Sequence, residues 1–237
     1  MRRAFVTIGI LILIAGTVTA WAVSDYVIPH TWKYKITIEV ETPEGIVSGS
    51  AVRQISARLG VRLMPEVKPV QYDIKGEAVV VDLRERGILF GLIDWTAPWE
   101  VEAAFPLRTI DYAEKLNYYS NLPNGKTAEL TYNHPKMVTF TDREDPKTVA
   151  LVYHQKRGGR IGEVSGVEDH FEEFFGEGVR LKGITIEMTD EPVTWGKVDQ
   201  YVTEDFWSKF RAWMKSMNIR ERGKFIHLFE FKEGEKK

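Results

Sequence analysis

The chain has 237 residues, of which 43% are hydrophobic and 28% are charged, a balance typical of a folded globular protein and too apolar for a disordered one. Its 32 Lys and Arg residues face 34 Asp and Glu residues, so the net charge of −2 gives no general attraction for nucleic acid. The absence of Cys excludes disulfides, thiolate metal sites and Cys nucleophiles.

The N-terminus carries the strongest signal. Residues 1–4 are short and basic, and the nineteen residues 5–23 contain no charge. As a helix they would measure about 28 Å, close to the hydrocarbon thickness of a bilayer, about 30 Å. Because Arg2 and Arg3 favour a cytoplasmic N-terminus, residues 5–23 are interpreted as a single-pass transmembrane anchor, with residues 24–237 outside the cytoplasm.

A cleaved signal peptide is the competing interpretation. Ala20-Trp21-Ala22 fits the pattern before a cleavage site, and the most apolar part, residues 5–15, is short enough for a signal peptide. Cleavage would remove residues 1–22. Both interpretations place residues 24–237 in an extracytoplasmic space.

Residues 24–237 are predicted to form one α+β domain, built on a mainly antiparallel sheet with two amphipathic helices. Residues 33–41 alternate apolar and polar side chains as a half-buried strand does, and residues 46–55 return as its partner, with Gly49 a candidate bulge. Residues 77–83 and 87–93 form a second hairpin, whose nearly continuous apolar runs are typical of central strands covered on both faces.

Residues 94–135 contain four prolines and are interpreted as an insertion lying over the sheet. Within the insertion, residues 109–119 favour a short helix. Asn124-Gly125 is typical of a two-residue hairpin turn.

The second half of the chain continues the same mixture of strands and helices. Further strands are predicted over residues 137–140, 148–153, 181–188 and 224–231, and helices over residues 167–175 and 203–217, before a frayed tail at residues 232–237. The second helix has an aromatic face beside a basic face, and docking on the sheet is favoured over contact with a membrane interface.

One four-residue pattern occurs twice. Residues 36–39 and residues 184–187 both read Ile-Thr-Ile-Glu. Convergence on strand-favouring residues explains this better than a duplicated half.

Motifs with a defined chemistry are largely missing. Gly125-Lys126-Thr127 lacks the upstream glycine that a phosphate-binding loop needs, and the five His residues are scattered. The sequence therefore assigns no catalytic residue, no metal and no cofactor.

Three groups of residues remain candidates for binding. Two Trp residues and an acid in the insertion could stack on a sugar or a peptide. A carboxylate-rich turn could bind a cation, and a Gly-Gly loop with several basic side chains could bind an anion. The competing interpretations are buried Trp residues, a charged turn and a solvated loop. The candidate binding residues are Asp94, Trp95, Trp99, Asp142, Arg157 and Arg160.

Residues 37–50, 137–149 and 175–196, with the single apolar N-terminal segment, resemble a family of uncharacterised proteobacterial envelope proteins. Residues 203–237 depart from that pattern. The resemblance implies an anchor in the bacterial inner membrane through residues 5–23 and a periplasmic C-terminal domain. It implies no activity, cofactor or catalytic residue.

Two functions fit these observations. The first is a non-enzymatic envelope protein that binds a partner protein or an envelope component. The alternative is an envelope hydrolase in which Asp82, Asp94 and Asp142 converge in the fold. Two carboxylates, or a carboxylate and a His, within about 3–5 Å in one concave pocket would favour the hydrolase.

Overall fold

The structure is a computed structural model, and the predicted N-terminal anchor lies outside the residues that it describes. No helix among the described residues is long and apolar enough to cross a bilayer. The described ranges are residues 28–60, 69–93, 96–159, 163–225 and 230–234.

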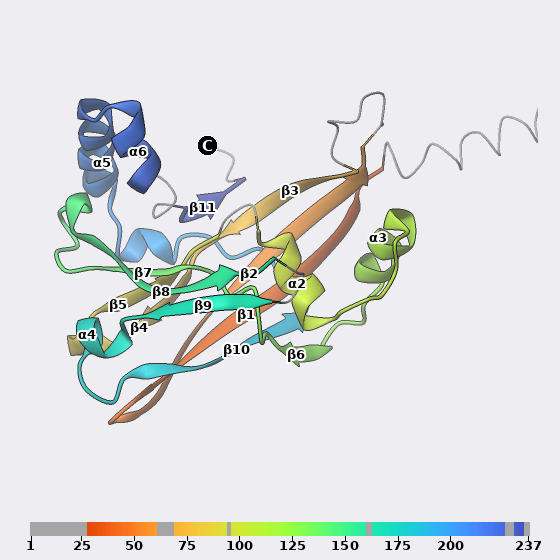
Figure 1. The fold of residues 1–237 in the computed structure, drawn as a ribbon, viewed down its shortest axis with the longest axis horizontal. Coiled ribbons are helices and arrows are strands. Elements are labelled where there is room, and N and C mark those ends of the chain that lie inside the picture. Colours follow the sequence, from red (N-terminus) through yellow and green to blue (C-terminus); the bar gives the residue numbers. More distant parts are fainter. Residues whose placement is uncertain (1–27, 61–68, 94–95, 160–162, 226–229, 235–237) are drawn as a thin grey trace, which may run out of the picture.

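An antiparallel sheet of six strands, here the large sheet, runs along the length of the molecule (Figure 1). Its strands alternate buried and half-exposed side chains, so one face lies on the core and the other meets solvent. In sheet order they are β11 (Lys232–Glu233), β3 (Val70–Glu77), β2 (Gly45–Leu59), β1 (His30–Thr42), β10 (Arg180–Met188) and β6 (Thr127–Glu129).

A second antiparallel sheet of five strands, here the small sheet, packs on the inner face of the large sheet. The predicted hairpin over residues 77–93 lies here, and its strands are covered on both faces, as expected. However, β4 is the edge strand and only β5 is interior. In order, the strands are β4 (Val79–Asp82), β5 (Ile88–Gly91), β7 (Met137–Phe140), β8 (Val149–Arg157) and β9 (Val164–Asp169).

Helices complete two hydrophobic cores, one between the sheets and one on the outer face of the small sheet. The core between the sheets is completed by side chains of α2 (Pro98–Ala104), α3 (Tyr112–Ser120) and α4 (Phe171–Phe175). The outer face of the small sheet is covered by α5 (Glu204–Ser216), which is followed by α6 (Ile219–Phe225). The described residues thus hold more α-helices than the two amphipathic ones and the short one predicted over residues 109–119, which is present as α3, and the architecture is α+β. Short 3-10 turns lie at η1 (Arg84–Arg86), η2 (Pro146–Thr148) and η3 (Val198–Gln200).

The repeated Ile-Thr-Ile-Glu pattern is explained by strand pairing. The two copies lie on β1 and β10, which are antiparallel neighbours, and Ile36 pairs with Ile186 while Ile38 pairs with Ile184. All four isoleucines are buried in the core between the sheets, as their alternation predicted. The repeat therefore reflects a shared environment on one sheet face.

Gly49 was predicted as a bulge, and this is wrong. The pairing of β1 with β2 is continuous through Ile38 and Gly49. The glycine is needed because β4 crosses it closely: a Cβ at Gly49 would lie 2.0 Å from the carbonyl oxygen of Val80. Gly91 on β5 makes a second close approach, where a Cβ would lie 2.4 Å from Cδ1 of Ile38. Glycines thus set the spacing of the two sheets.

Two predictions in the middle of the chain are wrong, one in where a helix starts and one in the kind of turn. Residues 167–175 are not one helix, because Val167 pairs with Gln155 in β9 and the helix starts only at Phe171, whose N–H donates to the side chain of Asp169. Asn124-Gly125 makes no hairpin. The Gly125 N–H donates to the carbonyl of Met188 instead, so this turn leads into β6.

The C-terminal strand predicted over residues 224–231 is wrong at the residues that the structure describes, because residues 224–225 are helical and residues 230–231 precede the last strand; residues 226–229 lie outside the described residues. Asn218 accepts hydrogen bonds from the N–H groups of Arg220 and Glu221, while the Glu221 carboxylate accepts from the N–H of Asn218. This reciprocal cap starts α6, which extends to Phe225. The tail predicted at residues 232–237 begins instead with β11, which pairs with β3.

The helix predicted over residues 203–217 is confirmed as α5, and it docks on the small sheet. Thr203 caps it by accepting the Phe206 N–H. Phe206 is buried with its ring edge against Phe140, at a centroid distance of 5.0 Å. Trp213, which was expected on the same stripe, is half-buried at the margin of this second core.

The close approach at Gly49 gives a first testable prediction. Replacing Gly49 by Ala places a methyl group against the Val80 carbonyl and should destabilise the fold by about 1–3 kcal/mol, because the backbones must separate. Gly159→Ala is the matched control, since a Cβ there meets nothing within 4 Å. Urea denaturation of both variants measures the difference. Equal midpoints would show that the sheets do not need this glycine.

Candidate functional site

Two adjoining depressions lie where the turn between β7 and β8 faces α5. Their volumes are about 560 and 970 Å³, and they share Asp142 and Glu144. We call them together the β7–α5 groove. One wall comes from the turn, one from α5 and one from η1 with the end of α4. Residues that characterise the lining are Asp142, Glu144, Phe174, Tyr201, Asp205 and Trp213.

The turn that forms the first wall is fixed by its own hydrogen bonds. The Asp142 carboxylate accepts the N–H of Glu144 at 2.9 Å, and the Asp145 carboxylate accepts the N–H of Lys147 at 3.0 Å. The hydroxyl of Thr148 donates to the carbonyl of Asp142 at 2.7 Å. The first two contacts are Asx turns, which Asp forms readily. They hold the turn in one shape and leave the exposed side chain of Glu144 facing the groove.

The α5 wall contributes a charge pair and an aromatic ring. Lys209 lies one turn after Asp205 and pairs with its carboxylate at 2.8 Å. The pKa of Lys209 is raised, first by its hydrogen bond to Asp205 and further by the charges of Glu144 and Asp142. Lys209 therefore remains protonated between the carboxylates of both walls. Trp213 stands one turn further along the helix.

The third wall is fixed by Arg86. Its guanidinium pairs with the carboxylate of Glu44 at 2.7 Å and donates to the carbonyl of Phe175 at 2.8 Å. The pKa of Glu44 is lowered, first by its hydrogen bond to Arg86. These contacts join η1 to the β1–β2 turn and to the end of α4.

Tyr201 connects the groove to Asp82. The Tyr201 hydroxyl donates to one oxygen of the Asp82 carboxylate at 3.0 Å, and the other oxygen accepts the N–H of Arg84 at 2.8 Å. The pKa of Tyr201 is raised, first by burial and then by Asp82. Both oxygens of Asp82 are therefore engaged in holding the start of η1 against η3.

The candidate binding residues do not gather at one place. Asp142 lines the groove, whereas Trp99 is half-buried on α2, well apart from α5 in Figure 1. Arg157 ends β8, which begins near the groove and is nine residues long, or about 26 Å. Their binding roles remain predictions. The other three candidates lie outside the described residues: Asp94, Trp95 and Arg160.

The lining offers limited chemistry. No His is among the described residues that line the groove. In the part of the chain that the structure describes, no group of three or more His, Asp or Glu side chains is arranged to hold a metal ion.

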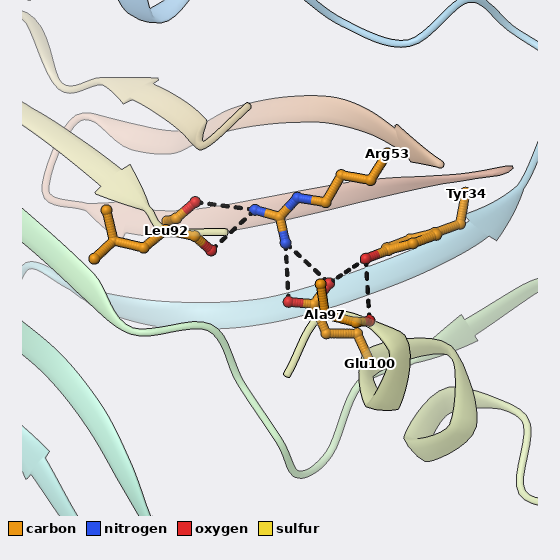
Figure 2. A network of polar contacts seen from close by, with 6 residues as sticks. Tyr34, Arg53, Leu92, Ala97 and Glu100 are labelled. Atoms are coloured by element: carbon orange, nitrogen blue, oxygen red, sulfur yellow. Dashed lines mark hydrogen bonds and ion pairs between the residues drawn. The ribbon is translucent and has the colours of Figure 1, made fainter. Parts of the chain in front are cut away.

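A buried ionic network, which the sequence analysis did not anticipate, lies between the sheets (Figure 2). The Arg53 guanidinium donates through Nη1 to both carboxylate oxygens of Glu100, each at 2.9 Å. Its Nη2 donates to the carbonyls of Gly91 and Leu92 at 3.1 and 3.0 Å. The hydroxyl of Tyr34 donates to Glu100 at 2.7 Å. Arg53 and Tyr34 are fully buried, and Glu100 is 1% exposed.

Opposing effects fix the ionisation of this network. Burial is the largest single effect on the pKa of Arg53 and lowers it, but the charges and hydrogen bonds of Glu100 and Tyr34 together outweigh burial, and the net pKa is raised. The pKa of Tyr34 is raised well above its usual value by burial and by Glu100, so its hydroxyl stays neutral and donates. Arg53 thus joins β2 of the large sheet to the end of β5 and to α2.

A sequence signal for Arg53 did exist. Ala51, Ile55 and Ala57 occupy the inward positions of β2, and Arg53 interrupts that row. A charged residue at a core position requires a buried partner. The alternation pattern alone does not identify Glu100 as that partner.

Comparison with known proteins gives no relative on which a function could be based: no protein-family model, no curated protein and no solved structure matches this chain.

The buried network generates a second prediction. Arg53→Met leaves the Glu100 carboxylate buried without its cation and should destabilise the fold by about 3–5 kcal/mol. The double variant Arg53→Met with Glu100→Leu removes both charges and should recover a large part of that loss. Chemical denaturation followed by Trp fluorescence measures the wild type, the single variants Arg53→Met and Glu100→Leu, and the double variant. A double variant as unstable as the sum of the two single variants would contradict the pairing.

Proposed function

We propose that this chain is a membrane-anchored, extracytoplasmic binding module that holds a partner protein of the cell envelope in the β7–α5 groove. The anchor is residues 5–23, and residues 24–237 form the periplasmic domain of an inner-membrane protein. The observation that carries the proposal is the groove itself, a concavity with rigid walls and half-exposed aromatic side chains.

The position of the groove supports this role. The described chain begins at Ile28 beside the start of β1, and the β1–β2 turn at the other end of this strand contacts the groove wall through Glu44 and Arg86. β1 has thirteen residues, so its ends lie about 40 Å apart. An anchor that precedes β1 would therefore leave the groove far from the bilayer and open to a partner.

The lining resembles a surface for a polypeptide more than a pocket for a small molecule. Phe174, Tyr201 and Trp213 are half-buried, so each presents an aromatic face beside charged neighbours. Aromatic residues of this kind contribute most to protein interfaces, whereas small-molecule sites are more enclosed and more apolar. Acidic and basic side chains both line the groove, and this favours a partner that carries positive and negative charges.

The hydrolase alternative receives less support from the geometry. The carboxylates of Asp82 and Asp142 are engaged by backbone N–H groups of their own turns. The third carboxylate, Asp94, lies outside the described residues.

Membrane topology gives a third prediction. Alkaline phosphatase fused after Lys237 should be active, because the C-terminus would lie in the periplasm, and a reporter that works only in the cytoplasm should be inactive there. The opposite pattern would refute the placement. Intact-mass analysis separates the two N-terminal interpretations, since a mature chain starting at Val23 would identify a cleaved signal peptide.

Partner binding gives a fourth prediction. A photo-crosslinking amino acid at Lys147, which is exposed in the groove, should yield a discrete adduct in native membranes. The same probe at Asp73, which is exposed on β3, should not. Ala212→Arg fills the groove from the exposed side of α5 and should abolish the adduct.

The matched control is Ala113→Arg, the same substitution in α3 at the other end of the molecule, which should leave the adduct unchanged. An adduct that persists with Ala212→Arg, or equal labelling from Lys147 and Asp73, would assign the partner to another surface.

A further inference from the structure

The helix α3 lies across the end of the large sheet at which the described chain begins (Figure 1). At its C-terminal end, the hydroxyl of Ser120 is 3.3 Å from Nδ1 of His30, and the ring of Tyr119 is 5.9 Å from that of Trp32. Lys115 of α3 pairs with the carboxylate of Glu102, which also accepts the hydroxyl of Tyr72 on β3 at 3.1 Å. The helix therefore spans β1 to β3.

A hydrogen-bonded turn fixes the start of α3. The Asp111 carboxylate accepts the N–H groups of Ala113 and Glu114 at 2.8 and 3.3 Å. The N–H of Asp111 donates to the hydroxyl of Thr109 at 3.1 Å, and that hydroxyl donates to the Glu114 carboxylate. The backbone on both sides of Ile110 is thus held in place.

This rigid turn presents apolar side chains to solvent. Ile110 is 98% exposed, the most exposed of the large hydrophobic residues in the described chain, and Tyr112 is 42% exposed. Ile28, the first described residue, is 64% exposed. A turn with this much internal bonding would accommodate a polar residue at position 110 equally well, so folding does not explain the isoleucine.

The location of Ile110 identifies what would cover it. The start of β1 and α3 share one end of the molecule, and the uncharged residues 5–23 precede β1 by a few residues. Tyrosines and large apolar side chains are both typical of protein surfaces that contact the boundary between headgroups and acyl chains. The carboxylates of Asp111 and Glu114 are exposed, and each accepts hydrogen bonds within the turn, from backbone N–H groups and from the Thr109 hydroxyl respectively.

We propose that Ile110 and Tyr112 rest in the outer surface of the bilayer and hold the domain upright, with the β7–α5 groove directed away from the membrane. This inference rests on the proposed anchor at residues 5–23. Besides the covalent link to the anchor, the domain itself would then contact the lipid, and this contact would limit rotation of the domain about its anchor.

The test uses the full chain reconstituted in vesicles of phosphatidylethanolamine and phosphatidylglycerol that contain brominated lipid. Because the chain has no Cys, single-Cys variants accept an environment-sensitive fluorophore at one position only. The variants are Ile110→Cys, Ile14→Cys within the anchor, and Ile219→Cys. Ile219 is 85% exposed at the start of α6, at the opposite end of the domain.

The inference predicts a blue-shifted emission and quenching by brominated lipid at positions 110 and 14, and neither at position 219. If position 14 is quenched but position 110 shows neither a blue shift nor quenching, as expected for position 219, the inference is overturned and the anchor is kept. Absence of quenching at position 14 would overturn the anchor and the inference with it. A blue shift at position 110 without quenching would indicate protein cover and would also overturn the lipid contact.

The variant Ile110→Asp tests whether the lipid contact can be removed without unfolding the domain. Ile110→Asp should not change the melting temperature, because the side chain is exposed. A fluorophore at Tyr112→Cys should lose its quenching when Ile110→Asp is added. If the fluorophore at position 112 is still quenched in the Ile110→Asp variant, Ile110 does not hold the turn in the bilayer, and its proposed role is overturned.

Discussion

The fold depends on a buried guanidinium. Arg53 lies fully buried on the inner face of the large sheet, and its partners come from two other layers, Glu100 on α2 and the carbonyls of Gly91 and Leu92 at the end of β5. An unpaired charge at this position would cost several kcal/mol. The large sheet, the small sheet and α2 therefore reach their native arrangement together. The network also fixes the chain on both sides of residues 94–95, so the start of the insertion is tied to the sheets.

The second consequence concerns the groove. The sheets approach closely at Gly49 and Gly91, so the small sheet is covered on its inner face and has a second apolar face that also needs cover. That cover is α5, held by the contacts of Phe206 with Phe140. The groove lies at the margin of this second core, where α5 faces the β7–β8 turn. The shape of the candidate site thus follows from how the small sheet is packed on both faces.

The sequence predicted the parts of the fold that depend on local signals. Alternation along β1 and β10 was sufficient to place Ile36 and Ile186 on one core, and the Thr203 cap was sufficient to start α5. The failures have physical causes. Gly49 is explained only by a strand thirty residues later, and the cap at Asn218 was present in the sequence but was outweighed by the apolar run that follows. The groove was not predicted, because its walls come from segments far apart in the chain and no local pattern encodes their meeting; of the candidate binding residues, Asp142 lines it.

The two ends of the domain carry different kinds of surface. At one end the turn before α3 presents an exposed isoleucine and is held rigid by hydrogen bonds, at the same end of the large sheet as the start of the described chain. At the other end the β1–β2 turn contacts the groove wall through the Glu44–Arg86 pair. The β1–β2 hairpin connects these ends without an irregularity in its register, so it acts as a stiff spacer. On the proposed placement, any force that a partner exerts in the groove would be carried along this hairpin to the membrane-facing end. The buried Arg53–Glu100 pair, about midway along β2, then resists sliding between the sheets under that load.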